Sequence, residues 1–148
     1  MSKYFGPHLM LDFPVDSDKL CDIPFWEDLL EELVETVKMT PLSRPTVVYS
    51  ECDNAAWDPP HATGVSGYIV LAESHISFHT FHESQFVFLD IFSCKPFDYN
   101  DVFDVLEKKL GAHDYHTNVV HRGKNFPGCA PKETTYGEFK RKAMTGQR

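Results

Sequence analysis

Cysteine is scarce in this chain of 148 residues, and none of its cysteines forms a CxxC pair. The four cysteines, Cys21, Cys52, Cys94 and Cys129, lie far apart along the sequence. A zinc ribbon needs closely spaced cysteine pairs, so the spacing excludes one. A disulfide framework is not expected either, because such frameworks belong to cysteine-dense secreted chains.

Long apolar runs and an excess of positive charge are also missing. No run reaches the roughly 18 apolar residues that a membrane span needs. Residues 1–13 lack the apolar stretch and cleavage site of a secretory signal, so we expect a cytoplasmic protein. Lys plus Arg is 14 against 22 for Asp plus Glu, a net charge of -8. Such a chain is a poor nucleic-acid binder, but its surface would attract a cationic substrate.

The composition that remains is that of one globular domain. Apolar residues make up 42% of the chain, including 12 phenylalanines, which is enough for a sizeable core. We therefore predict a single domain over residues 1–148. Residues 123–148 are rich in Gly, Lys and Thr and have no clear period, which predicts a loop-like C-terminal tail.

Hydrophobic periodicity predicts two helices and six strands. Apolar residues recur every three or four positions over 24–39 and again over 98–110, where Gly111 supplies a stop. The predicted strands span residues 8–13, 46–51, 65–72, 75–81, 86–94 and 116–121, and residues 52–63 are predicted to form a loop. The short links between successive strands require antiparallel pairing. Two helices can cover only one face, so we predict an α+β fold, a two-layer α/β sandwich whose other face meets water or a partner.

Most of the reactive side chains lie in residues 64–83, which hold three histidines, two glutamates and three serines. In a strand, His75 and His79 share one face while Ile76 and Phe78 share the other. Taken alone, this pattern is that of a strand with a solvated polar face. A metal site is disfavoured, because His75 and His82 have opposite parity and no HExxH motif or cysteine pair is nearby.

The run GVSGYIVLAESHISFHTFHE, continued by FVFLDIFSC, resembles the bacterial-type S-adenosylmethionine decarboxylase family. These are pyruvoyl-dependent enzymes made as self-cleaving proenzymes. The specific features are Glu-Ser-His, a second His five residues after the Ser, and a Cys fifteen residues after that His. The segment GPHLMLDF is similar to the family's first strand, so the resemblance covers residues 4–122.

The resemblance implies that the chain cuts itself between Glu73 and Ser74. The Ser74 hydroxyl would attack the Glu73 carbonyl to give an ester, and elimination would then leave a pyruvoyl group on residue 74. The products would be a β chain, 1–73, and an α chain, 74–148. The pyruvoyl group would form a Schiff base with the substrate amine and accept electrons as carbon dioxide leaves.

The resemblance also implies roles for five other side chains. His79 would act as the processing base and Ser66 would assist it by hydrogen bonding. Cys94 would be the proton donor in decarboxylation, because a thiol with a pKa of about 8.5 is mostly protonated at neutral pH. Glu83 matches the family carboxylate that binds the substrate ribose, and Phe81 keeps an aromatic ring beside it.

The sequence departs from the family pattern where the substrate would bind. The family has an aromatic ring six residues before the processing serine, where this chain has Pro60; Trp57 or His61 could supply a substitute ring. Three interpretations stay open: an S-adenosylmethionine decarboxylase that supplies the aminopropyl donor for spermidine synthesis, a related arginine or ornithine decarboxylase, and a non-catalytic regulatory homologue. The resemblance implies a homodimer with the pyruvoyl group as cofactor, and we find no metal, nucleotide or flavin motif.

Overall fold

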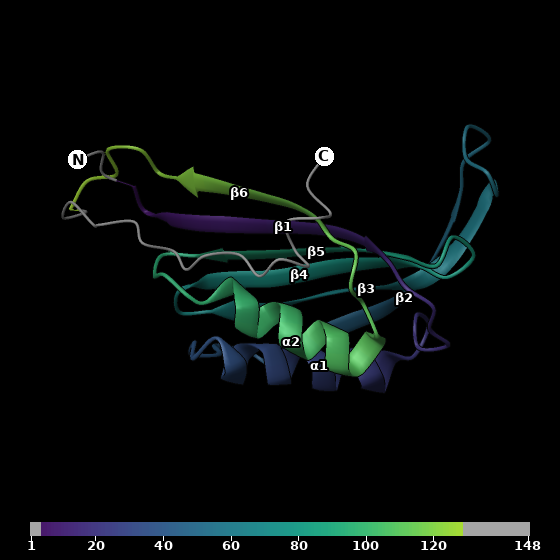
Figure 1. Ribbon diagram of the computed structural model, residues 1–148, viewed down its shortest axis with the longest axis horizontal. Helices are drawn as coiled ribbons and strands as arrows, with labels where there is room; N and C mark the ends of the chain where they lie inside the picture. The colour runs from purple at the N-terminus through teal and green to yellow at the C-terminus, as the bar shows by residue number, and fades with distance from the viewer. Residues whose placement is uncertain (1–3, 129–148) are drawn as a thin grey trace.

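The computed structural model describes residues 4–128, which form six strands and two helices in the predicted order (Figure 1). The elements are β1 Gly6–Pro14, α1 Ile23–Thr36, β2 Thr46–Asp53, β3 His61–Leu71, β4 Ser74–Phe81, β5 Phe86–Ser93, α2 Tyr99–Leu110 and β6 His116–Arg122. Residues 123–128 follow β6 without forming a further helix or strand. The rest of the predicted tail, 129–148, lies outside the described residues.

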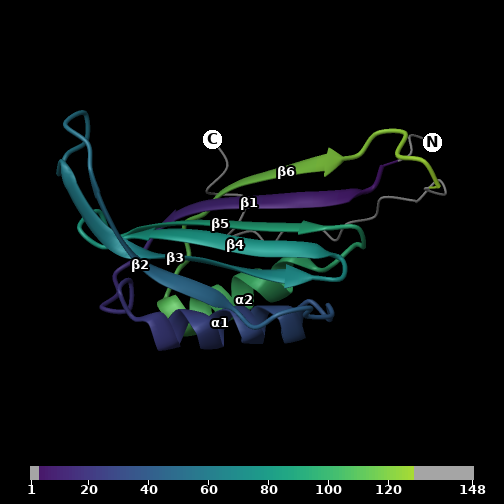
Figure 2. The same ribbon diagram turned by 180° about the vertical axis from the view of Figure 1, so that it is seen from behind.

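The strands form one antiparallel sheet in the order β2-β3-β4-β5-β1-β6. Both helices lie on the same side of it, and no described element covers the opposite face (Figures 1 and 2). The predicted two-layer α+β sandwich is therefore confirmed. We call the uncovered side the open face. Neither helix within residues 4–128 is long and apolar enough to cross a bilayer.

The helix boundaries follow from capping chemistry. The Asp22 carboxylate accepts a 3.0 Å hydrogen bond from the Phe25 amide at the start of α1. The helix ends at Thr36, earlier than the predicted residue 39, and Lys38 follows in the left-handed region with φ of 58°. Gly111 has φ of 67° and ends α2 as predicted, because glycine adopts this conformation without steric cost.

The β2–β3 hairpin is longer than the sequence predicted. Strand pairing runs out to Asp53 and His61, so only residues 54–60 form the connecting loop. The prediction of a loop over 52–63 was wrong in extent, because cross-strand hydrogen bonds extend both strands into the polar segment. The hairpin reaches beyond the rest of the sheet and curls away at one end of the molecule (Figures 1 and 2).

The core lies between the sheet and the helices. Trp26 of α1 stacks on Phe78 of β4 at 4.3 Å between ring centroids, and its indole nitrogen donates to the Lys19 carbonyl. Strand β4 alternates as predicted, with Ile76 and Phe78 buried and His79 exposed on the open face. The core thereby fixes which side chains β4 presents to the open face.

Candidate active site

The turn between β3 and β4 carries the Glu73–Ser74 peptide bond. Ser74 begins β4 with φ of 152°, a conformation that residues with a side chain rarely adopt. A residue held in such a region stores roughly 1–3 kcal/mol of strain. The Glu73 carbonyl oxygen accepts a 2.8 Å hydrogen bond from the Cys94 amide, just after β5.

These two features suit attack on the Glu73 carbonyl. An amide N–H aimed at a carbonyl oxygen stabilises the negative charge that develops there when a nucleophile adds. The strain at Ser74 raises the free energy of the intact peptide relative to a product in which that bond is broken. Cys94, whose side chain is half-buried, therefore contacts this turn through its backbone amide.

Ser66 and His79 form a second polar pair on the open face. They lie directly opposite one another on β3 and β4, with 2.7 Å between Ser66 Oγ and His79 Nδ1. Gly64 lies beside them, where a Cβ would come within 2.1 Å of the Thr80 carbonyl oxygen, so only glycine fits. The pair lines a small pocket of about 220 Å³ that also includes Phe81. The Ser66 contact holds the imidazole in a fixed orientation.

The Glu73–Ser74 turn and the Ser66–His79 pair are far apart within one chain. His79 lies five positions along β4 from Ser74, about 16 Å at the usual rise per residue in a strand. The Glu73–Ser74 turn lies at one end of β4, and the Ser66–His79 pair lies towards the other, nearer the β2–β3 hairpin tip. The structure thus groups Glu73, Ser74 and Cys94, and separately Ser66, His79 and Phe81.

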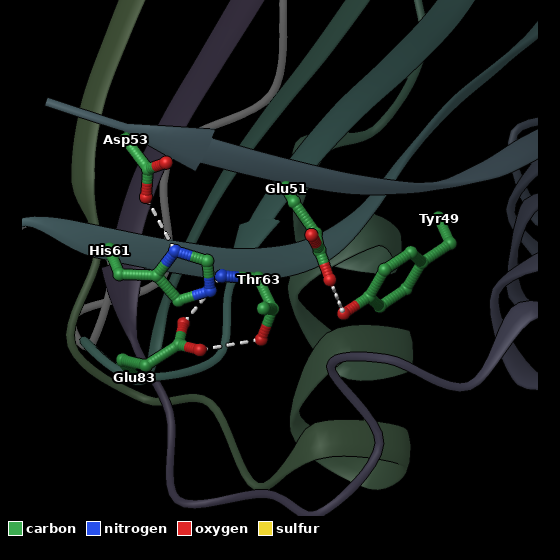
Figure 3. Close-up of polar contacts among 6 residues, drawn as sticks. All are labelled: Tyr49, Glu51, Asp53, His61, Thr63 and Glu83. Atoms are coloured by element: carbon green, nitrogen blue, oxygen red, sulfur yellow. Dashed lines mark hydrogen bonds and ion pairs between the residues drawn. The ribbon is translucent and has the colours of Figure 1, made fainter.

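Glu83 lies next to the second group, where both of its carboxylate oxygens bind one residue (Figure 3). Oε2 accepts a hydrogen bond from the Thr63 amide and Oε1 accepts one from the Thr63 hydroxyl, each at 2.6 Å. Burial alone would raise the Glu83 pKa, but the bonds from Thr63 outweigh it, and the pKa lies below its usual value. Glu83 is therefore held as a carboxylate.

Aromatic side chains line a larger pocket beside Glu83 and Thr63. Trp57, Phe81, Phe86 and Phe88 surround a space of about 480 Å³. The Trp57 and Phe81 rings meet edge to face at 5.8 Å. His61, the other candidate for a substitute ring, instead has its imidazole 2.6 Å from Asp53, a contact that raises its pKa (Figure 3). Trp57 and not His61 thus belongs to the aromatic pocket.

Sequence reasoning missed two threonines that hold the reactive residues. Thr63 binds Glu83, and the Thr40 amide donates to the Glu73 carboxylate at 2.9 Å. Both contacts join segments that are distant in sequence and depend on strand register, so no local motif reveals them. Within the described range, no three His, Cys, Asp or Glu side chains are grouped as metal ligands.

Comparison with known proteins identifies the family. The family model described as S-adenosylmethionine decarboxylase matches residues 7–123. The chain belongs to the S-adenosylmethionine decarboxylase family. The matched range includes both groups of site residues, so the family resemblance seen in the motif extends across the fold.

Individual relatives agree with this assignment. An S-adenosylmethionine decarboxylase proenzyme from Clostridium botulinum (strain Loch Maree / Type A3) is 30% identical over 82% of this chain and 97% of its own length. Another from Thermoplasma acidophilum is 34% identical, over 80% of this chain and 83% of its own length. A crystal structure of the Aquifex aeolicus adenosylmethionine decarboxylase aligns with a TM-score of 0.66 at 26% identity, covering 87% of this chain and 99% of that one.

Proposed function

We propose that this chain is a pyruvoyl-dependent S-adenosylmethionine decarboxylase that activates itself by cleavage between Glu73 and Ser74. The observation that supports the cleavage site is the hydrogen bond from the Cys94 amide to the Glu73 carbonyl, next to the strained Ser74. An amide in this position would stabilise the negative charge that develops on the carbonyl oxygen when a nucleophile adds, which supports cleavage at this peptide bond.

In the cleavage step, Ser74 Oγ adds to the Glu73 carbonyl carbon and its proton passes to a base. The peptide C–N bond then breaks, giving an ester between Glu73 and Ser74 and a free amine on Ser74. Removal of the Ser74 α-proton expels the Glu73 carboxylate and leaves a dehydroalanine. Hydrolysis of its imine form consumes water and releases ammonia, leaving a pyruvoyl group at residue 74.

His79 and Ser66 are the proposed base and its partner, yet they cannot reach Ser74 of their own chain. We therefore propose that they serve Ser74 of a second copy in a homodimer. The open face carries five apolar side chains that are each 40–54% exposed, namely Val48, Tyr68, Val70, Phe88 and Val120. Burying such a surface between two copies is favourable. In such a dimer, the sheet of the second copy would cover the Ser66–His79 pair.

In decarboxylation, the pyruvoyl carbonyl would supply an electrophile that binds the substrate amine and draws electrons from the bond to the departing carboxylate. The chain's own residues would bind the substrate and deliver a proton. Cys94, beside residue 74, is the proposed proton donor to the substrate carbon. Glu83, held as a carboxylate by Thr63, is suited to accept hydrogen bonds from ribose hydroxyls.

The aromatic pocket favours S-adenosylmethionine over arginine or ornithine as substrate. Trp57, Phe81, Phe86 and Phe88 offer ring faces and edges to a flat purine, which the two basic amino acids lack. The acidic charge of the chain does not discriminate among the three substrates, because all of them carry positive charge. The product would then serve as the aminopropyl donor for spermidine synthesis.

Intact-protein mass spectra of the purified chain test this function, followed by carbon dioxide release from the three substrates side by side. We expect two fragments that meet at residues 73 and 74, a pyruvoyl-blocked α chain, and release from S-adenosylmethionine. A Ser74→Ala chain should stay whole and inactive. Release from arginine or ornithine instead would move the assignment to a basic amino acid. A wild-type chain that stays uncleaved on long incubation would contradict the enzymatic function and favour a regulatory homologue.

A further inference from the structure

The segment between α1 and β2 is hydrogen-bonded to residues 70–73, which lead into the Glu73–Ser74 bond. The Leu42 amide donates to the Val70 carbonyl, and the Ala72 amide donates to the Thr40 carbonyl, each at 2.9 Å. The Thr40 amide donates in turn to the Glu73 carboxylate. Residues 40–42 thus lie against the β3 side of the turn that carries the Glu73–Ser74 bond, and the segment that joins α1 to β2 is seen in Figure 2.

Lys95, which lies just after β5, also binds this segment. Its ammonium group donates to the Lys38 carbonyl, with 2.6 Å between Nζ and the oxygen. Lys38 follows the C-cap of α1 and has φ of 58°. The C-terminal end of a helix carries partial negative charge, so an ammonium group bound just beyond it is favourably placed.

These hydrogen bonds form a closed chain of contacts that begins and ends on Glu73, the residue before the scissile bond. Lys95 directly follows Cys94, whose amide holds the Glu73 carbonyl. Lys95 also binds Lys38, and two residues further on Thr40 holds the Glu73 side chain. Glu73 is therefore hydrogen-bonded at its carbonyl by the segment after β5 and at its carboxylate by the segment after α1. Lys95 connects these two segments. After cleavage at residue 73, Lys38 and Lys95 would also lie on different chains.

We propose that Lys95 is a positioning residue for self-cleavage, which keeps the Glu73 carbonyl on the Cys94 amide by anchoring residues 38–40 against the turn. This inference rests on the proposed function. Lys95 does not touch the reacting atoms and acts through Lys38 and Thr40. Without the anchor, the turn can relax away from the Cys94 amide, and the strained Ser74 can relax with it.

The rate of cleavage tests the proposal, measured by intact mass after rapid purification of full-length chains. We expect Lys95→Ala to slow cleavage about tenfold, equivalent to about 1.4 kcal/mol in the barrier. Lys95→Arg should restore a rate within about twofold of wild type, since a guanidinium can also donate to the Lys38 carbonyl. Lys109→Ala is the matched control, because it removes a lysine contact with Glu32 on the helices. The proposal is wrong if Lys95→Ala cleaves at the wild-type rate, or if Lys109→Ala slows cleavage equally.

Hydrogen exchange separates this proposal from the proposed function. In a Ser74→Ala background, which cannot cleave, Lys95→Ala should lower the protection of the Thr40 and Cys94 amides about tenfold while leaving that of the Ile76 amide unchanged. Unchanged protection at Thr40 and Cys94 overturns the positioning role. A wild-type chain that never cleaves contradicts the proposed function, and the exchange result still decides whether Lys95 anchors the turn.

Discussion

Ser66 and His79 face each other across β3 and β4 with 2.7 Å between Oγ and Nδ1, but they lie about 16 Å along the sheet from Ser74. A base at this distance cannot take a proton from Ser74 of the same chain. Because His79 lies too far from Ser74 within one chain, we propose that the open face packs against a second copy. Each copy would then complete the other's reaction centre.

Loss of the Ser66 hydroxyl should slow self-cleavage. Ser66→Ala removes the contact that orients the His79 imidazole, and a misplaced base is a weaker one. We expect a roughly tenfold or greater slowing of fragment formation, followed by intact mass. Ser77→Ala, on the same face of β4, is the control and should cleave at the wild-type rate. Equal rates for Ser66→Ala and wild type would remove Ser66 from the processing machinery.

Trp57 should set the affinity for a purine substrate. Trp57→Ala removes one wall of the aromatic pocket, so we expect the KM for S-adenosylmethionine to rise about tenfold with kcat within about twofold. Trp57→Phe keeps a ring and should stay near wild type. The measurement is the initial rate of carbon dioxide release against substrate concentration. An unchanged KM in Trp57→Ala would show that the purine binds elsewhere.

The charge on Glu83 should matter for binding more than for turnover. Glu83→Gln removes the carboxylate that Thr63 holds in position, and we expect KM to rise about tenfold. Glu32→Gln, on the helical side, tests for a general effect of lost charge. A fall in kcat with no change in KM would mean that Glu83 acts on the reacting atoms instead.

His8 should make folding stability depend on pH. Burial lowers its pKa, and the Asp90 carboxylate, 3.5 Å from Nε2, only partly offsets this. As pH falls from about 6.5 through the lowered pKa, the unfolded chain gains a proton that the folded chain does not, so stability falls. The urea midpoint should therefore drop between about pH 7.5 and about pH 5.5, and drop less in His8→Asn. The control is His113→Asn, at an exposed position; a His8→Asn chain with an undiminished drop would exclude His8 as the cause.

The sequence predicted the layers and strand faces correctly because both depend on local periodicity. The alternation of Ile76 and Phe78 with His79 follows directly from the two-residue repeat of a strand. The reach of the β2–β3 hairpin was not predictable, since the pairing of Asp53 with His61 extends strands into a segment rich in turn formers.

The candidate residues were found by motif, but their grouping was not. The motif places Ser74 and His79 five residues apart, which gives no warning that β4 separates them along its length. The contacts of Thr40 with Glu73 and of Thr63 with Glu83 join distant segments. Such contacts depend on how elements pack, so only the folded chain reveals them.

A complementation experiment tests the two-copy reaction centre most directly. The Ser74→Ala chain keeps His79 but cannot be cut, and the His79→Ala chain keeps Ser74 but lacks the base. Each alone should remain whole. Coexpressed with distinguishable tags, they should form mixed dimers in which only the His79→Ala chain is split between residues 73 and 74, as read by intact mass. A His79→Ala chain that stays whole in verified mixed dimers, or one that splits at the wild-type rate on its own, would contradict a base supplied by the second copy.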